Sequence, residues 1–164
     1  AIKLSSPGPI FFKQKRSGED GREFWCYKFR SMKVNAQCDI LQATANDPRK
    51  TRIGEIMRKT SVDELPQFIN VLKGDMSIVG PRPERPELVE EFTNEIPEFP
   101  DRMKVKAGLT GYAQVYGKYN TTPYDKLKFD LMYIRKYSVL LDLKLIIMTP
   151  KILFLKESTE GVEK

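Results

Sequence analysis

Residues 59–72, which read KTSVDELPQFINVL, decide how the rest of the chain is organised. Two adjacent acids, Asp63 and Glu64, follow a basic segment and lie at the expected start of a helix. Pro66 limits where that helix begins, because a proline lacks the backbone N–H and is tolerated only in the first turn. We expect Asp63 or a neighbour to be the N-cap, although the spacing of Ser61 and Glu64 also resembles a capping box.

The helix that follows is predicted to run to about Leu72. Its apolar side chains recur at helical spacing and are expected to face the core: Leu65, Phe68, Ile69 and Leu72. Both acids would lie at the positive end of the helix dipole, which favours their ionised forms. Taken alone, the spacing favours a structural cap at Asp63, with Glu64 exposed on the first turn.

Length and composition bound the class of protein. The chain has 164 residues, which suits a single domain over residues 1–164. It carries 28 Lys and Arg against 22 Asp and Glu, and this net charge of +6 suits an anionic partner such as a nucleic acid, a membrane surface or a phosphorylated molecule. Histidine is absent, so a Ser-His-Asp or Cys-His site is excluded. The two cysteines, Cys26 and Cys38, lack metal-ligand spacing and indicate reduced thiols.

Two segments rich in aromatic residues, 10–16 and 23–30, flank a glycine-containing loop and predict a β-hairpin. The hairpin carries five cationic side chains, namely Lys13, Lys15, Arg16, Lys28 and Arg30. Basic and aromatic residues on a sheet can bind RNA through stacking and phosphate contacts. A solvated hairpin face is the favoured interpretation, because the chain has no RNP-type aromatic signature.

The remaining pattern is mostly helical. Helices are expected over residues 32–45, 51–59, 87–95, 124–137 and 139–149, with a short apolar strand over 76–80. No GxGxxG fingerprint follows a strand, so a Rossmann nucleotide site is not expected. The predicted fold is α/β (α+β), dominated by helices, with a small β-hairpin or sheet.

Two charged features outside residues 59–72 are candidates for a functional role: the arginines at residues 82 and 85, and Asp130. Three prolines around residues 81–86 hold an extended chain that presents Arg82 and Arg85, and a rigid frame for arginine suits phosphate recognition. A linker with solvated arginines is the alternative. Asp130 flanks the apolar face of the helix over 124–137, where a structural pairing is favoured over a functional role.

The C-terminal segment from residue 139 onward is apolar, but Asp142 and Lys144 lie too deep in it for a membrane-spanning helix. It could rest on anionic lipid as an interfacial helix, or it could be a buried core helix. The tail over residues 157–164 is polar and is expected to be frayed.

Six segments, taken together and in order, resemble the bacterial sugar transferases, which are monotopic phosphoglycosyl transferases that load a phosphosugar onto polyprenol phosphate. The matching segments are residues 6–12, 27–32, 58–71, 80–83, 106–115 and 142–144. The resemblance implies a membrane-associated catalytic core on the cytoplasmic face of the inner (plasma) membrane, with a re-entrant membrane helix just before Ala1. The chain departs from many members at Tyr116-Gly117-Lys118, where they carry Asn-Gly-Arg.

The resemblance also implies roles for particular residues. Asp63 would be the nucleophile that attacks the β-phosphorus of a UDP-sugar, releases UMP and holds the phosphosugar until polyprenol phosphate accepts it. Mg²⁺ would bridge a carboxylate and the diphosphate, with Glu64 as the matched metal ligand beside Asp63. Asp130 matches a further active-site acid. The basic residues implied at the substrate phosphates are Arg58, Arg82, Lys118, Lys28 and Arg30, although Lys118 lacks the bidentate fork of an arginine.

Two other classes of function compete with this one. A basic nucleic-acid-binding module would use the hairpin and leave the adjacent acids unexplained. A partner-docking domain without chemistry would use the C-terminal apolar helix. The resemblance favours a UDP-sugar, polyprenol phosphate and the membrane leaflet as partners and no nucleic acid, and an exposed C-terminal surface could support a homodimer.

Overall fold

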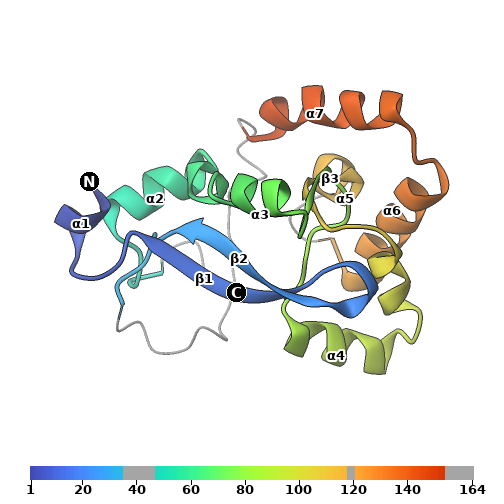
Figure 1. Ribbon diagram of the computed structural model, residues 1–164, viewed down its shortest axis with the longest axis horizontal. Coiled ribbons are helices and arrows are strands. Elements are labelled where there is room, and N and C mark those ends of the chain that lie inside the picture. The colour runs from blue at the N-terminus through green and yellow to red at the C-terminus, as the bar shows by residue number, and fades with distance from the viewer. Residues whose placement is uncertain (35–46, 118–120, 154–164) are drawn as a thin grey trace.

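Short helices and two small pairs of strands make up the chain in the computed structural model, which describes residues 1–34, 47–117 and 121–153 (Figure 1). In chain order the elements are α1 (Ile2–Ser5), β1 (Phe11–Ser17), η1 (Glu19–Gly21), β2 (Glu23–Phe29), α2 (Arg52–Lys59), η2 (Val62–Glu64), α3 (Gln67–Lys73), β3 (Ser77–Val79), α4 (Pro86–Glu95), η3 (Phe99–Lys104), β4 (Gly108–Thr110), α5 (Tyr112–Tyr116), α6 (Pro123–Arg135) and α7 (Val139–Leu153). The predicted helix-dominated α/β class is confirmed.

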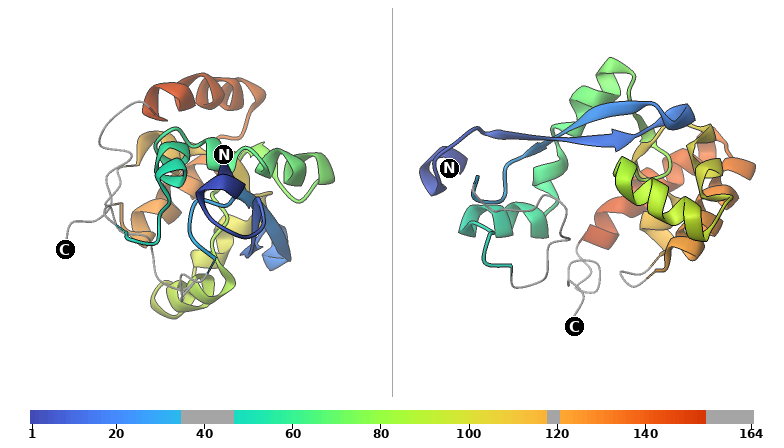
Figure 2. Two further views of the ribbon diagram at one scale, coloured as in Figure 1. Left: turned by 90° about the vertical axis from the view of Figure 1, so that its left-hand side faces the viewer. Right: turned by 90° about the horizontal axis from the view of Figure 1, so that it is seen from below.

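The predicted hairpin is confirmed as the antiparallel pair β1–β2, with Phe11 opposite Phe29 and Ser17 opposite Glu23. Seen from below, it extends from α1 and α2 at one end of the molecule to the helices around α4 at the other (Figure 2). Phe11 and Phe29 stack with their ring centroids 5.5 Å apart. The hairpin thus joins the two ends of the fold along one side.

The second sheet is a parallel pair, β3–β4, in which Ser77 is opposite Gly108 and Val79 is opposite Thr110. The strand predicted around residue 78 is confirmed, whereas no strand was predicted where β4 lies. Glycine is needed at the crossing because a Cβ on Gly108 would lie 2.1 Å from the backbone nitrogen of Gly80. This close approach fixes the start of the segment that carries Arg82.

The core lies between this small sheet and the last three helices. Val79 of β3 packs with Val115 of α5, Tyr133 of α6 and Leu145 of α7. The Tyr133 hydroxyl donates to Asp142 at 2.8 Å, which ties α6 to α7. The C-terminal helix therefore contributes to the core through Leu145, while most of its other apolar residues stay exposed.

Helix α7 continues past Pro150 to Leu153, beyond the predicted end of the helix. Within residues 1–34, 47–117 and 121–153, no helix is long and apolar enough to cross a membrane.

The predicted helix over residues 32–45 is not seen at its start. Met32 instead forms an isolated antiparallel bridge with Lys50. Residues 35–45 of that prediction, including Cys38, lie outside the described residues, as does the expected frayed tail over 157–164.

The predicted helix start at Asp63 is wrong by several residues. Ser61 takes a left-handed conformation with φ of 53°, the acids lie in the 3₁₀ turn η2, and α3 begins at Gln67 with Pro66 as its N-cap. Pro66 is tolerated there because the N-terminal donors of a helix have no intrahelical partner in any case. The acids therefore lie in a separate turn ahead of the helix.

The expectation that the apolar side of α3 faces the core is also wrong. Leu65, Phe68 and Ile69 are exposed, and Leu72 is 88% exposed. The covered side is polar, because Asn70, which is 0% exposed, donates to the Trp25 carbonyl at 2.8 Å and accepts from the Tyr27 N–H at 3.1 Å. Hydrogen bonding to the edge of β2, and not apolar contact, decides which side of α3 faces inward.

This arrangement predicts the effects of two substitutions in α3. Asn70→Ala is expected to lower the free energy of unfolding by roughly 2–3 kcal/mol, because it leaves backbone groups of β2 without their partners. Leu72→Ser, on the same helix, is expected to change it by less than about 0.5 kcal/mol. Urea unfolding monitored by circular dichroism would measure both, and a larger loss for Leu72→Ser would contradict the assignment of the buried side.

Candidate active site

The two adjacent acids differ in their surroundings. Asp63 is buried, and its carboxylate receives no hydrogen bond from the described part of the chain. Burial raises the pKa of Asp63 above its usual value, and the negative charge of Glu64 raises it further. The expected dipole effect therefore does not decide the charge of Asp63, because desolvation in the 3₁₀ turn acts in the opposite direction.

Glu64 is held by two cations. Its Oε1 accepts from Lys28 Nζ at 2.6 Å and from Arg82 Nη2, and its Oε2 accepts from Arg82 Nη1 at 3.1 Å. Burial alone would raise the pKa of Glu64, but the charges of Arg82 and Lys28 outweigh it and hold that pKa well below its usual range. Glu64 is therefore ionised, and it fixes one cation from β2 and one from the segment after β3.

Arg58 approaches the same acids from α2. Thr51 caps this helix by accepting from the Gly54 N–H at 3.0 Å, and Gly54 packs so closely that a Cβ there would lie 1.9 Å from the Ser31 carbonyl oxygen. Arg58 Nε donates to Ser31 Oγ at 2.8 Å. The positive charge of Arg58, together with those of Lys28 and Arg82, partly offsets the rise in the pKa of Asp63.

The structure thus brings together five residues that the family resemblance assigned to one site, namely Asp63, Glu64, Lys28, Arg58 and Arg82. Arg30, also expected at the phosphates, is directed elsewhere: its guanidinium donates to the carbonyls of Pro7, at 2.5 Å, and Ser6, at 2.6 Å. It anchors the N-terminal segment. Lys118 lies outside the described residues.

Asp130 was expected as a further active-site acid beside Asp63 and Glu64. Its ion-pair partner in the structure is Arg102. Its Oδ2 accepts from Arg102 Nε at 2.8 Å, and the pair is almost fully buried. Burial raises the pKa of Asp130, while the charge of Arg102 opposes the rise. The structural pairing favoured from the sequence pattern is therefore present.

Sequence reasoning missed Arg102 and Asn70. The sequence carries one usable signal for Asn70, because Gln67 and Asn70 are three residues apart on α3 and share a polar side that is buried. The sequence carries no such signal for Arg102, because its partners Asp130 and Arg82 are distant in sequence and it lies in a short 3₁₀ helix.

Mg²⁺ needs oxygen ligands, which one or two carboxylates supply together with the substrate phosphates. Asp63 fits, because its carboxylate is not hydrogen-bonded to the described part of the chain. Glu64 does not fit in this arrangement, because Arg82 and Lys28 occupy both of its oxygens. Within the described ranges, no group of three or more His, Cys, Asp or Glu side chains could hold a metal ion.

Asp63 lies beside Arg58, Lys28 and Arg82, and Glu64 fixes the last two in place, so this arrangement can receive an anionic ligand such as a phosphate. Comparison with known proteins agrees with this class. A family model described as bacterial sugar transferase matches residues 1–156, and the chain belongs to this family.

Several known proteins have sequences similar to that of the chain. The UDP-glucose:undecaprenyl-phosphate glucose-1-phosphate transferase of Escherichia coli K12 is 50% identical over 91% of this chain and 33% of its own length. The UDP-N-acetylgalactosamine-undecaprenyl-phosphate N-acetylgalactosaminephosphotransferase of Aeromonas hydrophila is 46% identical over 90% of this chain and 36% of its own length. The chain thus spans about a third of the length of these relatives.

Proposed function

We propose that the chain is a phosphoglycosyl transferase core that moves a sugar-1-phosphate from a UDP-sugar to polyprenol phosphate. The observation that carries the proposal is Asp63, a carboxylate without a hydrogen bond from the described residues, beside Glu64 with its two cations. The names of the relatives support the substrates, since they specify UDP-sugars and undecaprenyl phosphate. The sugar itself is left open, because the named relatives differ in it.

In the proposed reaction, an oxygen of Asp63 attacks the β-phosphorus of the UDP-sugar. The new bond joins that oxygen to phosphorus, and the bond to the bridging oxygen breaks, so that UMP leaves with the electron pair. A phosphate oxygen of the polyprenol phosphate then attacks the same phosphorus, which gives polyprenyl-diphospho-sugar and frees the Asp63 carboxylate. No proton needs to be removed from Asp63 when it is already ionised.

The surrounding cations serve the same steps. Two anions must meet, and the guanidinium of Arg58 and the cations fixed by Glu64 reduce their repulsion. Mg²⁺, held by Asp63 and the diphosphate, would supply further neutralisation of the phosphate charge. Glu64 in this proposal orients Arg82 and Lys28.

The acid limb of the pH–rate profile tests the environment of Asp63. The nucleophile must be ionised, and its pKa is raised by burial, so activity is expected to fall as pH drops through a value above the usual aspartate pKa of about 3.9. Steady-state rates from pH 3 to 8 would measure this. An acid limb at or below the usual value would contradict the buried, weakly solvated carboxylate described here.

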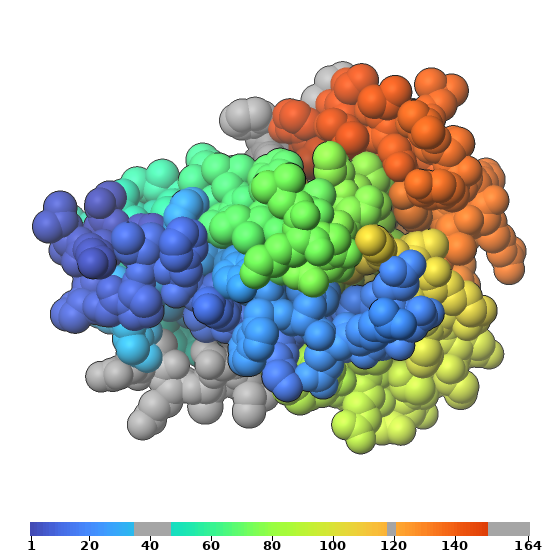
Figure 3. Space-filling view, viewed as in Figure 1, coloured from blue at the N-terminus to red at the C-terminus, as the bar shows by residue number. Residues whose placement is uncertain are grey.

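The proposal includes contact with the cytoplasmic leaflet of the inner membrane. Apolar side chains are exposed from η2 through α3 and again on α7: Val62, Leu65, Phe68, Ile69 and Leu72, with Val139, Leu140, Leu143 and Ile147. In Figure 3, α3 (green) and α7 (orange to red) are both visible from the same side of the molecule. Burial of apolar side chains in the interface, with lysines at the headgroups, is how monotopic segments bind lipid. This surface adjoins η2, so lipid contact would bring a lipid acceptor close to Asp63.

Binding to lipid vesicles tests that surface. Replacing Leu72 and Leu143 together with serine is expected to weaken binding to vesicles that contain anionic lipid by roughly tenfold, because two exposed apolar side chains lose their burial. Tyr124→Ser, a change of an exposed aromatic residue on α6, is the matched control and is expected to leave binding unchanged. Equal losses for both variants would argue for binding through charge alone.

The reaction is tested by supplying UDP-glucose or UDP-N-acetylgalactosamine with Mg²⁺ and polyprenol phosphate in detergent. UMP and a lipid-linked sugar are the expected products. Formation of UDP in place of UMP, or no reaction with any UDP-sugar, would contradict the proposal. Salt-sensitive RNA binding by the inactive chain would instead favour the nucleic-acid-binding alternative.

A further inference from the structure

Residues 81–84, which carry Arg82, can be fixed mainly through their carbonyl groups, because Pro81 and Pro83 have no backbone N–H. Every carbonyl in this segment has a donor. The donors are the Gly108 N–H for Pro81 at 2.9 Å, Arg102 Nη2 for Arg82 at 3.0 Å, Arg16 Nη1 for Pro83 at 3.0 Å and the Ser17 N–H for Glu84 at 2.9 Å. The backbone under Arg82 is therefore set by groups from the hairpin, η3 and β4.

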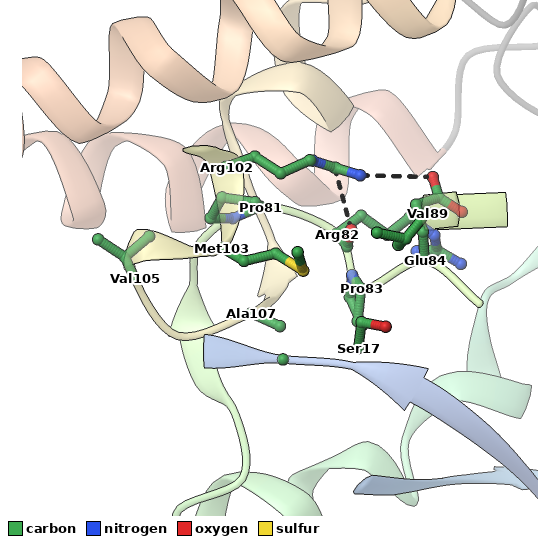
Figure 4. Close-up of a pocket in the computed structure, with 11 residues that line it drawn as sticks. Ser17, Pro81, Arg82, Pro83, Glu84, Val89, Arg102, Met103, Val105 and Ala107 are labelled. Atoms are coloured by element: carbon green, nitrogen blue, oxygen red, sulfur yellow. Dashed lines mark hydrogen bonds and ion pairs between the residues drawn. The ribbon is translucent and has the colours of Figure 1, made fainter. Parts of the chain in front are cut away.

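Arg102 is the donor that reaches Arg82 itself. Figure 4 shows its guanidinium extending across the top of a pocket, with contacts to the backbone of Arg82 and to the side chain of Glu84. The distance from Arg102 Nη1 to Glu84 Oε1 is 3.9 Å. Since Arg102 is only 3% exposed, it needs a partner for its charge.

Asp130 on α6 is that partner. Its Oδ2 lies 2.7 Å from Arg102 Nη2, the same nitrogen that donates to the Arg82 carbonyl, and 2.8 Å from Nε. Asp130 is 1% exposed. The carboxylate therefore fixes the plane of the guanidinium, and the guanidinium fixes the carbonyl of Arg82.

On its other side Arg82 reaches the candidate active site, where its two Nη atoms hold the two oxygens of Glu64. A chain of contacts thus runs from Asp130 to Arg102, through the backbone of Arg82 to its guanidinium, and on to Glu64. We propose that Asp130 is a positioning residue of the transfer reaction that acts through Arg102 to place Arg82, and is not an acid that contacts the substrate. The inference rests on the proposed function, because it assigns Arg82 to the substrate phosphates.

A double-mutant cycle on the chain of 164 residues tests the proposal. Asp130→Asn removes the negative charge that fixes Arg102. Arg82→Lys removes the planar guanidinium that Asp130 is inferred to position. Asp130→Asn alone is expected to lower kcat/KM for the UDP-sugar by roughly tenfold or more, and by less than about threefold when Arg82 is already lysine. An acid that acts on the substrate directly would cause the same loss in both backgrounds, and that result would overturn the proposal.

Two further variants separate positioning from folding. Tyr133→Phe, on the same helix, removes a buried hydroxyl that donates to Asp142 at 2.8 Å and is expected to lower the thermal midpoint without changing kcat/KM. Arg102→Lys replaces Asp130→Asn in the cycle if the latter does not fold, because lysine retains the charge but cannot bridge Asp130 and Arg82 with a planar fork. Loss of kcat/KM that follows thermal stability across all the variants would also overturn the proposal.

The outcomes distinguish this inference from the proposed function. If the unaltered chain and Tyr133→Phe both fail to release UMP, the proposed function fails. If both transfer sugar phosphate and the effect of Asp130→Asn is independent of Arg82, the proposed function stands and the positioning role fails.

Discussion

Replacing Asp63 with asparagine is expected to abolish transfer while leaving the fold intact. An amide is not a nucleophile toward phosphorus, so the rate is expected to fall by roughly 10⁴-fold or more. The change keeps the size of the side chain, and the Asp63 carboxylate accepts no hydrogen bond from the described residues, so little native bonding is lost. Removal of a buried charge with a raised pKa is expected to maintain or increase stability.

The measurement is intact mass after a single turnover with a UDP-sugar and no lipid acceptor. The unaltered chain is expected to gain the mass of one phosphosugar, and Asp63→Asn is expected to gain none. Asp101→Asn is the control, because Asp101 is a partly exposed acid that pairs with Lys104 at 2.8 Å, and it is expected to retain full activity. No adduct on the unaltered chain would favour direct transfer between two bound substrates.

Replacing Glu64 with glutamine is expected to produce the second largest loss, about 10²-fold in kcat/KM. Glutamine keeps the shape but removes the charge that holds Arg82 and Lys28, so two cations near the substrate phosphates lose their fixed positions. The KM for the UDP-sugar is expected to rise together with the fall in kcat, because the same cations meet the substrate in the ground state and the transition state.

A titration with Mg²⁺ shows which role Glu64 has. Since both of its oxygens are occupied by cations, the Mg²⁺ concentration that gives half-maximal rate is expected to be unchanged in Glu64→Gln. A shift of that concentration to higher values would assign the metal to Glu64, as the family resemblance implied. Lys28→Gln is a useful comparison, because it removes one of the two cations and leaves the Glu64 carboxylate in place.

Local patterns predicted much of the secondary structure. The hairpin follows from its aromatic segments, α2 from an apolar stripe and β3 from a short apolar run. Strand β4 could not be predicted in this way, because its three residues pair in parallel with β3, which is distant in sequence. The buried side of α3 could not be predicted either. Helical spacing of apolar residues does not distinguish a helix side that packs on the protein core from one that is exposed.

The candidate site was predicted in part, through charge and family resemblance together. Five of the expected residues do converge, because η2 contacts both α2 and β2 and because Arg82 reaches Glu64 from the proline-rich segment: Asp63, Glu64, Lys28, Arg58 and Arg82. Arg30 does not join them, since carbonyls of the N-terminal segment occupy its guanidinium. Nothing in the spacing of Asp130 pointed to Arg102, because this contact depends on the tertiary fold.

The hairpin emerges from the ribosome long before the groups that hold it in place. Tyr27 binds Asn70, which is synthesised 43 residues later. Arg16 binds Pro83, which is synthesised 67 residues later. An isolated hairpin is marginally stable in water, and synthesis of 67 residues takes roughly 3–13 s. The aromatic strands therefore remain without these partners on the nascent chain for seconds.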